Sequence, residues 1–363
     1  MSGNFEQAKA FFLQGLEHYR AGRFAQAERA YAASLALLPG RVSTLTNLGA
    51  AQVKLGRMQD AIELLDEALA QEPDNPEAIG HRATALAELG RRADALSALE
   101  RLLQLQPEHG LTWSLRGLLL RDEGRLEEAA ESFRQAIAFG ADPALNGHYL
   151  AGVTGAAPPA PPRHYVESLF DSYADGFERH LVEVLKYRAP EVLVRPVAAS
   201  GRRFAAALDL GCGTGLCGAL VRPAVRWLEG VDLSANMVRQ ARARAVYDRV
   251  EQGDVAQHLA AATRRYDLVL AADVFIYVGA LDGVFAETAR VTEPGGLFCF
   301  SVEAAGEDED FALRPSLRYV HSERYLRRLA AAHGFAVDVV ERHPIREDQQ
   351  RPIPGLFAWL VRR

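Results

Sequence analysis

Three glycines, Gly211, Gly213 and Gly215, follow a short apolar run, FAAALDL at 204–210, and a helical stretch begins directly behind them. This order of strand, glycine loop and helix opens the nucleotide-binding sheet of many α/β proteins. Because glycine has no side chain, its backbone amide can approach a cofactor closely and positive φ angles cost little. The three positions therefore predict a cofactor-binding turn.

Carboxylates accompany the apolar runs of the same region. Asp209 lies in the first run, Asp232 in WLEGVDL (227–233), Asp254 in RVEQGDV (249–255) and Asp273 at the end of YDLVLAAD (266–273). A carboxylate can accept charge-assisted hydrogen bonds from hydroxyl or amino groups, worth about 1.5–3 kcal/mol each. As an alternative, Asp209 and Asp254 cap helices or close turns.

Further apolar runs predict the elements that position these residues. They are GLFCFSVE (296–303), AVDVVERH (336–343) and LFAWLVRR (356–363), and helical segments such as 235–247 and 284–292 separate the runs. Such alternation predicts a mainly parallel sheet with helices on both faces. Ligands then bind at the carboxyl ends of the strands.

The segment LDLGCGTG at 208–215 resembles the first motif of class I S-adenosylmethionine-dependent methyltransferases. The remainder fits that family in order from about residue 165, which implies a Rossmann-like, mainly parallel seven-stranded sheet with an antiparallel last strand. The G-x-G-x-x-G pattern of dinucleotide-binding proteins also matches at 213–218, but it starts two residues after the predicted strand end.

The resemblance implies S-adenosyl-L-methionine as the cofactor, with Asp232 on the ribose hydroxyls and Asp254 at the adenine amino group. The implied cofactor-binding residues are Tyr173, Asp209, Gly211, Cys212, Gly213, Gly215, Asp232, Leu233, Met237, Asp254, Val255 and Ala271. Tyr173 lies in an amphipathic helix expected over 164–185, with Leu169, Phe177 and Leu181 on the same face. It is a candidate lid over the cofactor or, alternatively, an ordinary core aromatic.

Asp273, Tyr277 and His321 are the candidate catalytic residues, because a hydroxyl, ammonium or carbon acceptor must lose a proton to a base. His321 titrates in a suitable range, although a lone His is often a cap or a buried hydrogen-bonding group. His343 and Arg346 are weaker candidates for contacts with an anionic acceptor. The acceptor pocket is expected from loops 304–320 and 343–354. No metal-binding motif is present, so we expect no metal.

The N-terminal half repeats with a period of 34 residues. Glycines recur in one series and alanines in another: Gly22, Gly56, Gly90, Gly124 and Ala27, Ala61, Ala95, Ala129. This pattern resembles the tetratricopeptide repeat, a helix-turn-helix unit. Small residues at Gly15, Gly49, Ala83 and Gly117 let paired helices approach, and larger residues such as Leu35, Leu65, Leu99 and Phe133 fill the gaps.

These patterns predict an all-α superhelical array of four tetratricopeptide repeats with a capping helix over 1–155, a proline-rich linker over 156–163, and a methyltransferase domain over 164–363. Such arrays usually present a concave surface to a protein or peptide. AAPPAPP at 156–162 is expected to form either a free, extended linker or a rigid surface loop packed against both domains.

Composition narrows the function further. The net charge of −6 makes nucleic acid an unexpected partner, and three cysteines suit a reducing cytoplasm. We expect neither a signal peptide nor a membrane span. The sequence thus predicts a methyltransferase of the bacterial repeat-containing type, acting on an unidentified protein or carrier-bound acceptor. The alternatives are a repeat scaffold with a non-catalytic cofactor-binding domain and, less favoured, an NAD(P)-dependent oxidoreductase.

Overall fold

A computed structural model of the chain describes residues 2–173, 185–348 and 350–363. The chain divides into two compact units, Met1–Leu150 and Ala151–Arg363. The division falls inside one helix, Pro143–Thr154. The boundaries 1–155, 156–163 and 164–363 remain a prediction.

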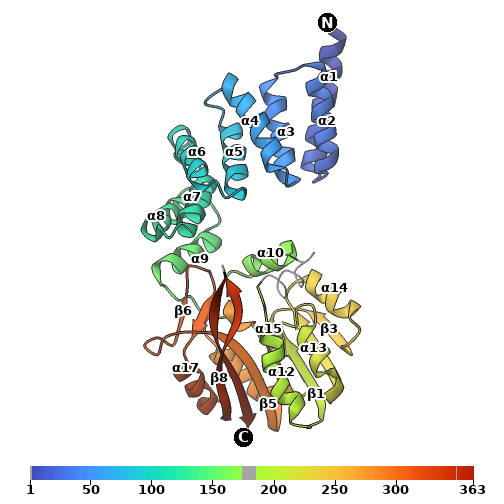
Figure 1. The fold of residues 1–363 in the computed structure, drawn as a ribbon, viewed down its shortest axis with the longest axis vertical. Helices are drawn as coiled ribbons and strands as arrows, with labels where there is room; N and C mark the ends of the chain where they lie inside the picture. Colours follow the sequence, from blue (N-terminus) through green and yellow to red (C-terminus); the bar gives the residue numbers. More distant parts are fainter. Residues whose placement is uncertain (1, 174–184, 349) are drawn as a thin grey trace. The chain divides into compact units, whose positions relative to one another are not determined.

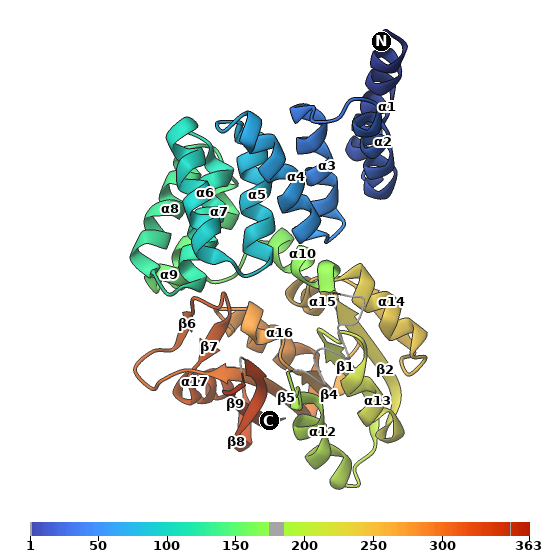
Figure 2. The ribbon, with the colours of Figure 1, turned by 45° about the horizontal axis from the view of Figure 1, so that its top comes forward.

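Antiparallel helix pairs build the first unit, and successive pairs stack side by side (Figure 2). The helices are α1 (Ser2–Arg20), α2 (Phe24–Leu37), α3 (Val42–Lys54), α4 (Met58–Gln71), α5 (Pro76–Glu88), α6 (Arg92–Leu105), α7 (Gly110–Asp122), α8 (Leu126–Ala138) and α9 (Pro143–Thr154). Four pairs followed by α9 agree with the predicted four repeats and capping helix.

The 34-residue period has a direct cause in backbone geometry and packing. Gly22, Gly56, Gly90 and Gly124 all have φ near +70° to +77° in the turn between paired helices. A Cβ added at Gly15 would lie 2.5 Å from the Tyr31 ring, and one at Gly117 would lie 2.5 Å from the Phe133 ring. Tyr31, and not Leu35, therefore shares the packing position of Phe133 in the first repeat.

A twisted sheet with helices on both sides forms the second unit (Figure 1). The helices are α10 (Arg163–Tyr173), α12 (Ala189–Ala199), α13 (Leu216–Val221), α14 (Ala235–Ala243), α15 (Val255–Ala261), α16 (Asp282–Val291) and α17 (Glu323–Ala332), with 3-10 turns η2 (Arg222–Ala224) and η3 (Phe275–Tyr277). The strands are β1 (Phe204–Leu210), β2 (Val225–Asp232), β3 (Arg249–Gln252), β4 (Tyr266–Ala271), β5 (Thr292–Ala304), β6 (Phe311–Leu313), β7 (Tyr319–His321), β8 (Phe335–Asp348) and β9 (Arg351–Arg362).

The strands β3, β2, β1, β4 and β5 run parallel, in that order, and β9 pairs antiparallel with β5 and with β8. The predicted mainly parallel sheet with an antiparallel last strand is confirmed. Within the described residues the sheet has nine strands and not seven. The short pair β6–β7 adds the difference, since it extends the end of β5 inside a segment that we expected to be loop.

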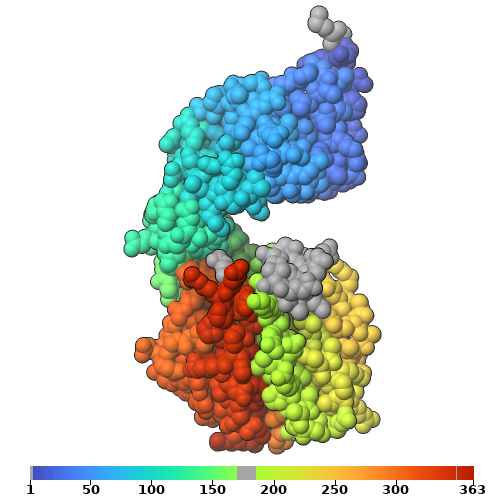
Figure 3. Space-filling model, in the orientation of Figure 1, coloured from blue at the N-terminus to red at the C-terminus, as the bar shows by residue number. Residues whose placement is uncertain are grey.

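Two buried layers hold the sheet. On one face α12 and α13 pack through residues such as Leu193 and Val221, and on the other α16 and α17 pack through residues such as Phe285 and Leu329. The C-terminal strands (red) lie beside α12 on the surface of this unit (Figure 3). Trp359 Nε1 donates a hydrogen bond to the Leu193 carbonyl oxygen at 3.1 Å, which ties β9 to α12.

The proline-rich segment 156–162 is hydrogen-bonded to another part of the second unit. The backbone amides of Gly279 and Ala280 donate to the carbonyl oxygen of Pro159, at 3.0 and 3.1 Å. These hydrogen bonds fix the segment within the second unit, which a free linker would not show.

None of the helices in the described ranges is long and apolar enough to cross a membrane.

Candidate active site

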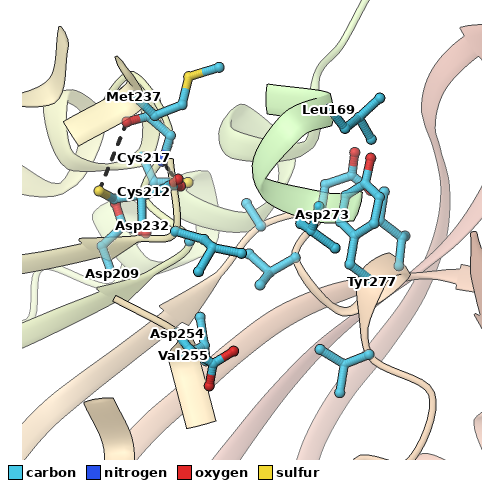
Figure 4. Close-up of a pocket in the computed structure, with 18 of the residues that line it drawn as sticks. Leu169, Asp209, Cys212, Cys217, Asp232, Met237, Asp254, Val255, Asp273 and Tyr277 are labelled. Atoms are coloured by element: carbon cyan, nitrogen blue, oxygen red, sulfur yellow. Dashed lines mark hydrogen bonds between the residues drawn. The ribbon is translucent and has the colours of Figure 1, made fainter. Parts of the chain in front are cut away.

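A cavity of about 590 Å³ opens at the carboxyl ends of β1, β2, β3 and β4. Parallel strands place their carboxyl ends at one edge, so residues far apart in sequence meet there. In Figure 4, Asp209, Cys212, Asp232 and Met237 lie on one side of the cavity, while Asp273, Tyr277 and Leu169 lie on the other. The site thus has two ends of different chemistry.

The glycine turn forms the wall of the first end. Gly211, Gly213 and Gly215 have φ of +62°, +54° and +94°, all in the region that disfavours other residues. A Cβ at Gly211 would lie 2.5 Å from Val274, whereas a Cβ at Gly213 would meet no protein atom within 4 Å. Gly213 therefore leaves open space on the cavity side of the turn, which a ligand can use.

Asp232 holds this turn in place. Its Oδ2 accepts the backbone N–H of Gly213 at 2.8 Å, and its Oδ1 accepts the N–H of Ser234 at 2.9 Å. Each carboxylate oxygen can accept more than one hydrogen bond, so this pairing is compatible with further bonds to two vicinal hydroxyls. Asp232 lines the cavity, as a ribose-binding residue would.

Asp254 and Asp209 have structural partners in addition to a place at the cavity. Asp254 caps α15, since its Oδ1 accepts the N–H of Gln257 at 3.0 Å, as the alternative interpretation expected. The buried Asp209 accepts the hydroxyl of Tyr247 at 2.7 Å. Burial raises the pKa of Asp209 to about 7, although the Tyr247 hydrogen bond opposes this shift.

The other predicted cofactor residues divide into three groups. Cys212, Leu233, Met237 and Val255 line the cavity. Gly215 and Ala271 are not among the lining residues. A Cβ at Gly215 would pack on Tyr247, and Ala271 is fully buried inside β4 while its neighbour Ala272 lines the cavity. The alternation of side chains along a strand explains this offset of one residue. Tyr173 ends α10, but its side chain, Phe177 and Leu181 lie outside the described set.

Asp273 and Tyr277, two of the three predicted catalytic residues, lie at the second end. Asp273 has φ of +58°, and its N–H donates to Ser301 Oγ at 2.9 Å. Its Oδ2 accepts a hydrogen bond from Arg346 Nη1 at 2.7 Å, and the same guanidinium binds Glu303. Burial raises the pKa of the Asp273 carboxyl, and Arg346 counteracts this rise. Burial likewise raises the pKa of Tyr277, which keeps its hydroxyl protonated.

His321 is placed away from the cavity, so the structure does not bring it together with Asp273 and Tyr277. It is fully buried in β7, and its Nε2 donates to the carbonyl oxygen of Gly279 at 2.9 Å. Burial lowers its pKa to about 4, so the ring is neutral at ordinary pH. His321 therefore joins β7 to the segment after β4, as the alternative of a buried hydrogen-bonding group expected.

Arg318 is a lining residue that sequence reasoning did not single out. The loop 304–320 was expected to form the acceptor pocket, but only the β6–β7 turn decides which of its residues reach the cavity. Arg346 does line the cavity, where it binds two carboxylates of the protein. His343 pairs instead with Glu341 at 2.8 Å on the surface.

A group of possible metal ligands, Glu229, Glu251 and His258, lies outside the cavity. Their donor atoms lie within 4.8 Å of one another. However, Arg249 already forms ion pairs with both carboxylates, and Tyr266 donates a hydrogen bond to Glu229 at 3.0 Å. Arg249 and Tyr266 thus already bind these carboxylates, so we do not assign a metal site to this group.

Family models agree with this architecture. A methyltransferase domain model matches residues 207–296, and tetratricopeptide repeat models match residues 12–76, 52–119 and 112–139. Class I methyltransferase domains bind S-adenosylmethionine, and the first end of the cavity fits it. Gly213, Asp232 and Asp254 all line this end, and their roles toward the cofactor remain a prediction.

Among curated proteins, malonyl-[acyl-carrier protein] O-methyltransferase of Enterobacter lignolyticus is 30% identical over 169 residues, 46% of this chain and 64% of that protein. Methyltransferase-like protein 27 of Homo sapiens is 36% identical over 142 residues, 36% of this chain and 55% of that protein. The chain therefore spans less than two thirds of the length of these relatives.

Among solved structures, magnesium protoporphyrin IX methyltransferase from Synechocystis is 19% identical, with a TM-score of 0.45, covering 55% of this chain and 99% of that chain. The family models, which cover both units, are the more specific finding. The family models thus identify tetratricopeptide repeats in the N-terminal part of this chain and a methyltransferase domain in its C-terminal part.

Proposed function

We propose that the chain transfers a methyl group from S-adenosylmethionine to a protein or carrier-bound acceptor that the repeats recruit. The main observation in support of this proposal is that the glycine turn, Asp232, Asp254 and Asp273 all line one cavity at the strand ends. Four separate segments of the sequence contribute these residues to the cavity. A cofactor at one end and an acceptor at the other would then meet inside the cavity.

The cofactor supplies a methyl group that its sulfonium already activates, so the protein mainly binds and orients. Asp232 and the glycine turn that it holds through the Gly213 amide form the cofactor end. The apolar side chains of Val166, Leu169 and Ile276 line the cavity and exclude water. Alignment of two reactants by such a cavity contributes several kcal/mol through proximity alone. The acceptor enters at the end formed by Asp273 and Tyr277.

Two observations favour an acceptor attached to a macromolecule. The first is the repeat array itself, since such arrays bind proteins or peptides. The second is that the relatives from Enterobacter and other bacteria are named for an acyl-carrier protein substrate. Residues 1–150 hold 15 basic and 20 acidic side chains, a charge of −5, which favours a basic partner segment.

Isothermal titration of the full-length protein with S-adenosylmethionine tests the cofactor assignment. Asp232→Ala removes hydrogen bonds to both the turn and the ribose and should weaken binding by about two to four powers of ten. Asp282→Asn is the control, because Asp282 is an exposed residue outside the cavity that pairs with His333. Lack of binding by the folded protein, or binding of NADH instead, would overturn the assignment.

Isotopically labelled cofactor added to a cell lysate tests the transfer. We expect label on a macromolecule with the wild-type protein and far less with Asp232→Ala. Cofactor binding with no labelled product in any fraction would favour the alternative of a repeat scaffold with a non-catalytic domain.

A further inference from the structure

The second end of the cavity contains one arginine whose guanidinium forms no close ion pair with a carboxylate of the described residues. Three arginines line the described part of the cavity: Arg163, Arg318 and Arg346. Arg163 pairs with Glu167 at 2.8 Å, and Arg346 is shared between Asp273 and Glu303. Arg318, by contrast, has Asp348 as its nearest described carboxylate, and the N···O distance is 4.0 Å. That distance is too long for a hydrogen bond.

Arg318 is held in position although its side chain is partly open. It occupies the turn between β6 and β7, where its carbonyl oxygen accepts the N–H of Arg314 at 3.0 Å. Its neighbours Leu317 and Tyr319 are buried, and its own side chain is 28% exposed. A hydrogen bond joins Arg318 to Tyr277, the candidate residue after β4. The guanidinium is therefore anchored at the acceptor end of the cavity.

The same end has no well-suited base among the described residues. His321 lies outside the cavity and donates to Gly279. Asp273 has one carboxylate oxygen bound to Arg346, and its other oxygen, Oδ1, is buried away from solvent. Tyr277 is a phenol that stays protonated. An acceptor that must lose a proton would find little help here, whereas a carboxylate is already ionised at neutral pH.

We propose that Arg318 binds a carboxylate on the acceptor and that this carboxylate is methylated, which makes the product a methyl ester. This inference rests on the proposed function and specifies its substrate class. A guanidinium presents two parallel N–H donors that match a carboxylate, and such bonds fix orientation as well as binding. Arg318 is then a specificity-determining residue, while Arg346 supports the site from within the protein.

The reaction is balanced without a proton acceptor. A lone pair of the acceptor carboxylate forms the new oxygen–methyl bond while the sulfur–methyl bond breaks and leaves its electron pair on sulfur. The carboxylate loses its negative charge, the sulfonium loses its positive charge, and no proton moves. Above pH 6 the transfer rate should therefore show no ionisation of a general base.

The chemical stability of the labelled product tests the substrate class. Full-length protein is incubated with methyl-labelled S-adenosylmethionine and a cell lysate, and the labelled fraction is then treated with mild alkali. A methyl ester releases volatile labelled methanol, whereas methylated nitrogen, carbon, phosphate or ether oxygen keeps the label. Alkali-stable label, or no transfer by a protein that binds the cofactor, would overturn the inference. Failure to bind the cofactor would instead overturn the proposed function.

Substitutions test the residue itself. Arg318→Gln should raise the concentration of acceptor fraction needed for half-maximal labelling at least tenfold and leave the cofactor Kd unchanged, and Arg318→Lys should lose less. Arg314→Gln is the matched control, since Arg314 belongs to the same turn but pairs with Glu309 outside the cavity. Equal labelling by wild type and Arg318→Gln, or equal losses for Arg318→Gln and Arg314→Gln, would remove Arg318 from acceptor binding.

Discussion

Arg346 Nη1 lies 2.7 Å from Asp273 Oδ2, so a residue of β8 holds a residue that follows β4, 73 positions earlier in the chain. The Arg346 side chain is 3% exposed and also binds Glu303 of β5. One cation thus pairs with two carboxylates at the acceptor end. The backbone of Asp273, at φ of +58°, is kept in a strained conformation by this surrounding structure.

Arg346→Met should destabilise the second unit by about 3–5 kcal/mol, because it leaves two carboxylates buried without a cation. Chemical denaturation followed by tryptophan fluorescence measures the change. Arg342→Ala is the control, since Arg342 is 58% exposed and pairs with Glu307 and Glu323 at 3.5 and 3.4 Å. Such surface pairs contribute about 1 kcal/mol or less. Similar losses in the two variants would contradict a special role for the buried group.

Gly213→Ala should weaken cofactor binding about tenfold or more, because its methyl group would fill the open side of the turn. Gly56→Ala in the repeats is a matched control. Both glycines have positive φ and free space around the added Cβ, so both substitutions cost about 1–2 kcal/mol of backbone strain. Titration calorimetry should separate them: an unchanged Kd for Gly213→Ala would mean that the cofactor does not approach this position.

The buried carboxyl of Asp209 should make stability depend on pH. Its pKa is about 7 in the folded state and 3.8 in the reference state, so the protonated form is favoured by folding. This stabilisation is fully present below 3.8 and is lost as the pH rises through about 7. Relative to wild type, Asp209→Asn should therefore gain stability across this window. Unfolding free energies of both proteins at several pH values measure it, and a constant difference would argue against the shift.

His321→Gln should keep most of the methyl transfer activity, because an amide can donate the same hydrogen bond to Gly279 but cannot act as a base. A general base contributes about 10²–10⁴-fold, so a catalytic His321 would show a loss of that size. Initial rates of label transfer by wild type and His321→Gln distinguish a structural His321 from a catalytic one.

The stability of the protein should also depend on the ionisation of His321. Folding favours the neutral ring, whose pKa is lowered from 6.5 to about 4. Its contribution to stability is thus present above 6.5 and is lost as the pH falls through about 4.

Local pattern was enough to predict much of the fold. The 34-residue period marks positions where turns need positive φ or where helices approach closely, and both are properties of single residue types. The strand cores, the glycine turn and the carboxylates Asp232, Asp254 and Asp273 follow from apolar runs and their ends. Convergence at one cavity could be anticipated too, since parallel strands end at a common edge.

Long-range packing determines which side chains reach the cavity and which partners they bind, and the sequence alone could not predict this. His321 and Arg318 are three residues apart, yet one is sealed in β7 and the other reaches the cavity, because a tight turn reverses the chain between β6 and β7. Arg346 could be proposed for an anionic acceptor, but the partners of a side chain depend on which strands become neighbours. The residue types thus determined a cofactor site, and only the tertiary structure decided which cation remains for the acceptor.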